Sequence, residues 1–114
     1  MDMDFYCSQV LSGRTSVAVV METANVLAFH QTRPSFQTHI VVIPRRHVLS
    51  LIDPSWSDDE ALDLIRALRA IAAQVVDRTG ACRVVTNLGK YQDSKHLHFH
   101  LVSGERLESS LRWP

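Results

Sequence analysis

The sequence predicts an α+β domain: a mainly antiparallel sheet of five strands with one long helix and a short N-terminal helix. Aliphatic and β-branched residues gather in five short runs that turn-forming residues separate. A single stretch with helical periodicity lies between the third and fourth runs. Strands that are mostly consecutive in sequence, with short connections, favour antiparallel pairing, and one helix then covers a face of the sheet.

The first half of the chain supplies the short helix and three strands. Residues 5–12 are mildly apolar and end at Gly13, which favours a short helix stopped by glycine. The turn residues 23–25 predict a hairpin between the first two strands, and Pro44 ends the third. These strands are expected at residues 17–22, 26–30 and 39–43.

The second half supplies the long helix and the last two strands, expected at 83–87 and 96–102. Ser57 and Glu60 form a capping-box pattern at the start of the helix, and Gly80 stops it. Two adjacent apolar stripes run along the helix: Ala61, Leu64, Leu68, Ile71 and Val75, and beside them Leu62, Ile65, Ala72 and Val76. A face this wide exceeds what one sheet needs, which predicts a homodimer through part of it.

Length and composition exclude several classes of protein. A chain of 114 residues has room for one core, so a single domain over residues 1–114 is predicted. The formal net charge is zero, which gives no reason to expect nucleic acid or a membrane surface as partner. No run reaches the ~18 apolar residues of a membrane span, and the acidic start lacks a signal-peptide pattern. Cys7 and Cys82 form no CxxC pair, which predicts buried, reduced cysteines in a cytoplasmic protein.

The most informative stretch is residues 96–102, where three histidines alternate with apolar residues. In an extended strand alternate side chains share one face, so His96, His98 and His100 would lie together. The core-facing residues would then be Leu97, Phe99 and Leu101. Imidazole can attack, transfer protons or bind metal near neutral pH, so this face is the predicted site.

Three chemistries fit such a row of imidazoles. The first is a zinc site, to which His39 or Asp93 could add a ligand. The second is nucleophilic catalysis at phosphorus, because a neutral imidazole attacks without a separate base and leaves a phospho-histidine. The third is a nucleotide-binding module that retains the pocket without turnover. The residues alone leave all three open.

Three segments resemble the histidine triad (HIT) family. The triad matches the signature His-φ-His-φ-His-φ-φ, where φ is apolar, at every position. Residues 38–47 resemble the family segment Thr-His-x-φ-φ-Ile-Pro-basic-basic-His. The ending at residues 111–114 resembles the Trp-Pro ending of the Hint-like branch, the histidine triad nucleotide-binding proteins. The resemblance implies a HIT-like fold, a homodimer, a nucleotide ligand and no cofactor or metal.

The resemblance also implies an activity, that of a purine nucleoside phosphoramidase or a related nucleotide hydrolase or transferase. His98 would attack the α-phosphorus of a nucleoside phosphoramidate or related conjugate, and water would hydrolyse the resulting nucleotidyl-histidine. His100 would lie against the phosphate and the leaving group, with His39 and His96 packed beside the centre. The implied nucleotide-binding residues are Asn87, Gln92, Asp93, Gln31, Phe29, Val10, Val41 and Trp113.

Three positions depart from the family pattern. Gln31 replaces an aspartate that grips the ribose hydroxyls, so it can hydrogen-bond but brings no charge. Tyr91 replaces a glycine and crowds the backbone approach to phosphate, for which Gly89 and Lys90 are the expected substitutes. Asp93 replaces a serine, and a carboxylate ~5 Å from a phosphate charge would cost about 3 kcal/mol at an effective dielectric near 20. Asp93 is therefore expected to be protonated, paired with a nearby lysine, turned away, or bound to an amine in the leaving group.

Overall fold

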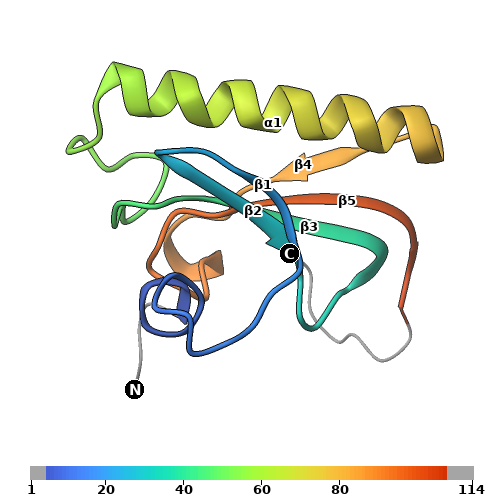
Figure 1. Ribbon diagram of the computed structural model, residues 1–114, viewed down its shortest axis with the longest axis horizontal. Helices are drawn as coiled ribbons and strands as arrows, with labels where there is room; N and C mark the ends of the chain where they lie inside the picture. The colour runs from blue at the N-terminus through green and yellow to red at the C-terminus, as the bar shows by residue number, and fades with distance from the viewer. Residues whose placement is uncertain (1–4, 108–114) are drawn as a thin grey trace.

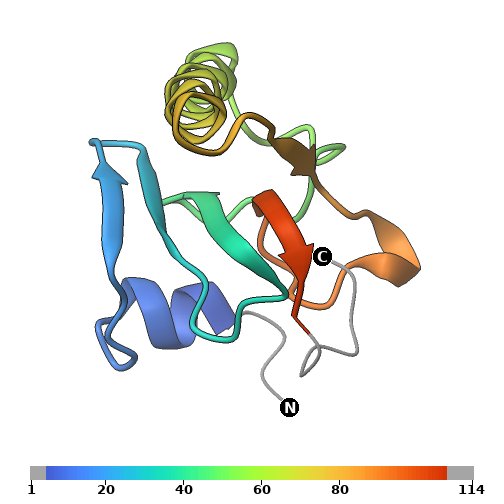
Figure 2. The same ribbon diagram turned by 90° about the vertical axis from the view of Figure 1, so that its right-hand side faces the viewer.

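A computed structural model describes residues 5–107 as a five-stranded antiparallel sheet between two helices (Figures 1 and 2). The strands lie in the order β1-β2-β3-β5-β4. The elements are η1 (Tyr6–Leu11, a π-helical turn), β1 (Val19–Glu22), β2 (Val26–His30), β3 (Phe36–Pro44), α1 (Asp58–Thr79), β4 (Arg83–Val85), η2 (Gly89–Tyr91, 3₁₀) and β5 (Phe99–Arg106). The α+β class, the five-stranded sheet and both predicted helices are confirmed.

Helix α1 begins and ends at the predicted residues. The Ser57 hydroxyl accepts from the Glu60 N–H at 3.1 Å, and the Glu60 carboxylate accepts from the Ser57 N–H at 3.0 Å. This reciprocal capping box satisfies two backbone donors that the helix itself leaves unpaired. Gly80 ends the helix with a φ of 88°, in the left-handed region that glycine adopts without steric cost.

The two faces of the sheet have separate apolar clusters. One lies under α1 and includes Leu64, Ile71 and, from the triad segment, Leu97, Phe99 and Leu101. The other lies on the opposite face beneath η1 and consists of Tyr6, Val10, Leu27, Phe29, Val41 and Ile43. Figure 2 shows the sheet between α1 and the N-terminal helix. The predicted alternation is therefore confirmed: the apolar residues of the triad segment face α1, and the histidines face the side of η1.

Strand β5 begins at Phe99, three residues after the predicted start at His96. The last pair between β3 and β5 joins Val42 to Phe99. Before it the chain leaves the ladder, because the Leu97 N–H donates to the Val48 carbonyl at 2.6 Å. Two of the three histidines thus precede the strand, although the alternation of side chains continues through them.

Three other strands also differ in length from the prediction. Strand β1 begins at Val19, later than residue 17. Strand β3 begins at Phe36, earlier than residue 39, and β4 ends at Val85, before residue 87. The side chain of Thr86 donates to the His98 carbonyl at 2.8 Å, so a side-chain bond replaces the backbone ladder there. No helix among residues 5–107 is long and apolar enough to cross a membrane.

Candidate active site

A cavity of about 660 Å³ lies on the η1 side of the sheet, beside the triad. Its volume falls within the ~300–1,000 Å³ typical of ligand pockets. Segments far apart in sequence meet around it: η1, the loop after β2, the end of β4 and the segment before β5. Its lining residues are Phe5, Tyr6, Thr15, Gln31, Thr32, Arg33, Ser35, His39, Asn87, Asp93, Ser94, His98 and His100.

His98 lies at the centre of the triad, and one backbone contact determines its tautomer. Its Nδ1 lies 2.7 Å from the carbonyl oxygen of His96. Because a carbonyl oxygen only accepts, the neutral ring has its hydrogen on Nδ1, and Nε2 is the unprotonated nitrogen. The ring is 5% exposed and packs between Tyr6 and His100, with centroids 4.9 Å and 5.0 Å away. His98 thus offers an unprotonated nitrogen to the cavity that it lines.

His100 ends a chain of hydrogen bonds that begins at a backbone amide. The Ser35 N–H donates to His39 Nδ1 at 2.9 Å, so the ring hydrogen of neutral His39 is on Nε2. His39 Nε2 lies 2.8 Å from His100 Nδ1, which therefore accepts. The remaining hydrogen of His100 is on Nε2, so this ring adds a donor to the cavity beside the lone pair of His98.

Burial keeps both histidines of this chain neutral. Desolvation lowers the pKa of His39 from 6.5 to about 4. Desolvation also lowers the pKa of His100 to about 3, with smaller contributions from the neighbouring His98 and His39. At pH 7 each ring has one N–H and one lone pair, as the hydrogen-bond chain requires.

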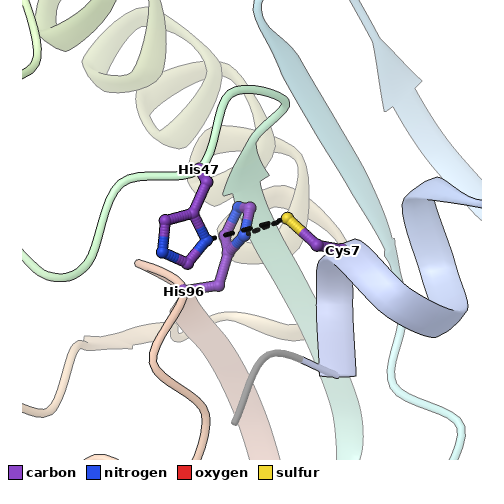
Figure 3. A group of neighbouring side chains, drawn as sticks. All are labelled: Cys7, His47 and His96. Carbon is purple, nitrogen blue, oxygen red and sulfur yellow. Dashed lines mark hydrogen bonds between the residues drawn. The ribbon is translucent and has the colours of Figure 1, made fainter. Parts of the chain in front are cut away.

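His96 has a different set of partners (Figure 3). Its Nε2 donates to the Pro44 carbonyl at 2.8 Å, which leaves Nδ1 as the acceptor. Cys7 Sγ lies 3.2 Å from this Nδ1 and 3.7 Å from Nδ1 of His47. The His47 ring packs edge-on against His96, with centroids 5.4 Å apart. Cys7 comes from η1, His47 from the loop after β3, and His96 from the segment before β5.

These three side chains could hold a metal ion. Their ligand atoms all lie within 4.8 Å of one another. Ligands around a tetrahedral Zn²⁺ are separated by roughly 3.3–3.6 Å when Zn–N is about 2.0 Å and Zn–S about 2.3 Å. The two measured contacts of Cys7 lie close to that range, and the bond from His96 Nε2 to a carbonyl is typical of a metal-bound histidine.

The location of this metal-ligating group differs from the zinc alternative considered from the sequence. His39 is engaged with His100 and Ser35, and Asp93 is absent from the group. Sequence spacing does not indicate that Cys7 approaches the triad, since 89 residues separate it from His96. Cys7 and Cys82 are both half-buried, so the prediction of buried cysteines is wrong for each.

Only some of the predicted nucleotide-binding residues line the cavity. Asn87, Asp93 and Gln31 line the cavity. Gln92 does not, because its Nε2 donates to the Leu49 carbonyl at 2.6 Å in a buried contact. Three apolar residues of this set are buried in the cluster beneath η1 and are absent from the cavity lining: Val10, Phe29 and Val41. Trp113 lies outside the described residues.

The loop before the triad shows where Tyr91 and its expected substitutes, Gly89 and Lys90, lie. Tyr91 is 82% exposed and is absent from the cavity lining, so it does not crowd the site. Gly89 and Lys90 are also absent from the lining, and the Lys95 ammonium donates to the carbonyls of Gly89 and Gln92. The cavity instead has Ser94, whose Oγ is buried without a hydrogen-bond partner among residues 5–107.

Several lining residues were not predicted from the sequence. They are Phe5, Tyr6, Thr15, Thr32, Arg33, Ser35 and Ser94. None lies in a motif, and only the fold brings their loops together around His98. An unpartnered buried hydroxyl such as that of Ser94 is a common sign of a ligand contact.

Comparisons with known proteins agree with this geometry. The sequence matches the HIT domain over residues 13–107, so the chain belongs to the HIT-domain family. A HIT-like protein from Azospirillum brasilense is 34% identical over 104 residues, which is 88% of this chain and 85% of that protein. A HIT-like protein from Synechococcus elongatus is 32% identical and covers all of this chain and 98% of its own.

Solved structures show the same fold. The HIT family hydrolase from Legionella pneumophila superposes with a TM-score of 0.73 at 28% identity, covering 97% of both chains. A histidine triad protein from Clostridium difficile gives 0.70 at 30% identity, covering 94% of this chain and 95% of its own.

Proposed function

We propose that this protein is a Hint-like nucleotide hydrolase or transferase, specifically a purine nucleoside phosphoramidase that acts through a covalent nucleotidyl-histidine on His98. The observation that supports this most directly is the tautomer of His98. Its Nδ1 hydrogen is directed to the His96 carbonyl, so Nε2 is the unprotonated nitrogen of a neutral ring that lines a nucleotide-sized cavity. The name of the Legionella relative, a HIT family hydrolase, supports the general class.

In the first step His98 Nε2 attacks the α-phosphorus and the bond from phosphorus to the leaving nitrogen breaks. The leaving amine departs with the electron pair of that bond and takes up a proton from solvent, and the water of the second step returns one proton to solvent. A bond from phosphorus to Nε2 forms. The resulting imidazolium would keep its Nδ1–H hydrogen-bonded to the His96 carbonyl. In the second step water attacks phosphorus, the bond to Nε2 breaks, and a nucleoside monophosphate is released.

The surrounding donors would stabilise charge on the phosphoryl oxygens. His100 offers its Nε2–H, whose position depends on the chain through His39 to the Ser35 amide. The Ser94 hydroxyl and the Asn87 side chain add donors from the side of β4 and β5. Donors held in place before the reaction need no reorganisation as charge develops. Asp93 lies in the same part of the lining and would attract an amine leaving group.

The nucleoside would lie on the opposite side, towards β2. The aromatic side chains of the lining, Phe5 and Tyr6, belong to the N-terminal segment, and Tyr6 packs on Phe29 of β2 with centroids 6.1 Å apart. A flat purine ring suits such a surface. Because β2 and β4 lie on opposite sides of the central pair β3 and β5, the two substrate arms would extend in opposite directions from phosphorus.

The same proposal includes a single-domain protein over residues 1–114, a homodimer and a cytoplasmic location. Leu62 and Ile65 of α1 are 46% and 54% exposed, and Val84 on the edge strand β4 is 46% exposed. These apolar side chains on neighbouring elements would suit a second copy of the chain.

The test is to mix the protein with an adenosine 5′-phosphoramidate, quench at short times and measure the intact mass. The proposal expects an added adenylyl group on the wild type, none on His98→Ala, and release of AMP. Binding of AMP without an adduct or hydrolysis would indicate the non-catalytic module instead.

A further inference from the structure

The cavity has two fixed charges, and they lie at opposite ends. Arg33 comes from the loop between β2 and β3, and Asp93 from the segment before β5. Phe36 at the start of β3 pairs with the end of β5, and Val42 near its other end pairs with the start of β5. The loop that contains Arg33 therefore lies at one end of β3 and the approach to β5 at the other. Asp93 is the only carboxylate, and Arg33 the only lysine or arginine, among the lining residues in the described part of the chain.

The loop after β2 has hydrogen-bond donors available to a ligand, while its side-chain acceptor, Gln31 Oε1, is used within the loop. The Thr32 N–H donates to Gln31 Oε1 at 2.9 Å, which determines the orientation of the Gln31 amide. The Thr32 hydroxyl lies 3.5 Å from the same oxygen. The amide N–H groups of Gln31 remain for a ligand. Arg33 is exposed at the rim, and its guanidinium makes no hydrogen bond or ion pair within residues 5–107.

A cavity lining with hydrogen-bond donors and a cation suits a phosphorylated ribose, whereas a lining with a carboxylate suits an unmodified ribose. The two hydroxyls of an unmodified ribose donate hydrogen bonds, and a carboxylate can accept both. A phosphorylated ribose instead needs donors and positive charge. Dinucleotide-binding folds make this exchange, with an acidic residue for the free hydroxyl and an arginine for the phosphate. Gln31 and Arg33 together correspond to the second arrangement.

We infer that the site selects nucleotides with a second phosphate on the ribose, at the 2′ or the 3′ oxygen, which Arg33 and the Gln31 amide bind. The inference rests on the proposed function, because it uses the nucleoside arm assigned there. The 5′-phosphorus lies at His98, the second phosphate lies at the rim, and an amine leaving group extends towards Asp93. An arginine binds phosphate through two parallel charge-assisted hydrogen bonds, which adds geometric selectivity to the charge.

The test is calorimetric titration with AMP, adenosine 2′,5′-bisphosphate and adenosine 3′,5′-bisphosphate, which separates the two positions. We expect one bisphosphate to bind about tenfold more tightly than AMP to the wild type, and less so at high salt. In Arg33→Gln this ratio should fall to about one while the affinity for AMP changes less than about twofold, because only the second phosphate loses its cation. Arg33→Lys should retain part of the preference.

Two matched variants complete the test. Arg69→Gln removes an exposed arginine on α1, away from the cavity, and should leave every affinity unchanged. Gln31→Asp introduces the carboxylate and should reverse the preference in favour of AMP. If AMP binds and neither bisphosphate binds more tightly, or if Arg33→Gln weakens all three ligands equally, the inference is wrong and the proposed function stands. If none of the three nucleotides binds, both are wrong.

Discussion

His96 and His100 flank His98 at the same spacing in sequence, but their side chains have different hydrogen-bond partners. On one side His100 is joined to His39 and a backbone amide in a buried chain of neutral groups. On the other side His96 contacts a thiol, a second imidazole and a carbonyl oxygen, a set that could bind metal. The same residue type at the same spacing thus has two chemical roles, and distant segments of the chain determine which.

The central ring depends on one of these sides directly. His98 donates its Nδ1 hydrogen to the carbonyl of His96, so the contacts that hold His96 also orient the proposed nucleophile. In the proposed mechanism the N–H of His100 on the other side faces the reacting phosphate. Under that proposal His96 would position the attacking atom, and His100 would stabilise the charge that the attack creates.

The largest loss of activity is expected from replacing His98, which lies between the two flanking histidines. His98→Ala should lower the hydrolysis of an adenosine 5′-phosphoramidate by roughly 10³-fold or more, since a catalytic nucleophile acts as a unit with its neighbours. The matched control is His30→Ala, an exposed histidine at the end of β2 that is absent from the cavity lining. Steady-state release of AMP measures both variants. Equal activities would show that His98 is not the nucleophile.

The side of His96 can be tested through its metal affinity. We expect the purified protein to bind about one Zn²⁺ through Cys7, His47 and His96, and Co²⁺ to give a tetrahedral thiolate spectrum. Loss of the thiolate in Cys7→Ser should weaken Zn²⁺ by at least about 100-fold, more than a change outside the ligand shell does. Cys82→Ser is the control, because Cys82 lies outside the group. Elemental analysis that finds no metal in either protein would contradict the assignment of Cys7, His47 and His96 as metal ligands.

The side of His100 can be tested through the residue that positions it. His39→Leu removes both the acceptor for Ser35 and the donor for His100, and should lower kcat by roughly tenfold to a hundredfold. His39→Gln offers an amide oxygen and an amide N–H in their place, so it should restore much of the rate. A purely structural role for His39 predicts no such rescue, because a buried leucine fills the space as well as glutamine.

A smaller effect is expected on stability. His39 and His100 have pKa values of about 4 and about 3 in the folded protein, below the ordinary 6.5. Between these values the unfolded chain binds more protons, so the free energy of unfolding falls as the pH drops below about 6.5. Each histidine contributes at most about 1.4 kcal/mol per pH unit. Urea unfolding at several pH values measures the slope, which His39→Gln should make shallower; a slope identical to that of the wild type would contradict the assignment.

The sequence predicts the helices and strands that support this site better than it predicts the residues that line the cavity. The capping box at Ser57, the glycine stop at Gly80 and the alternation around the triad are local patterns, and the structure confirms each of them. The start of β5 differs because a bond from Leu97 to Val48 replaces the ladder, and such a contact is not visible in a local pattern.

The cavity walls depend on contacts between distant segments. Cys7 and His47 reach His96 only through the packing of η1 and the loop after β3 against the segment before β5. Arg33 and Ser94 lie in irregular loops with no periodicity to reveal their direction. The family resemblance implies Gln92 as a nucleotide-binding residue, yet its side chain is directed to the Leu49 carbonyl.

The most direct measurement is the tautomeric state of the three triad rings, from two-bond ¹H–¹⁵N correlations on ¹⁵N-labelled protein near pH 7. Our account predicts hydrogen on Nε2 of His96, on Nδ1 of His98 and on Nε2 of His100. A hydrogen on Nε2 of His98 would contradict it, because Nε2 would then have no lone pair for attack on phosphorus.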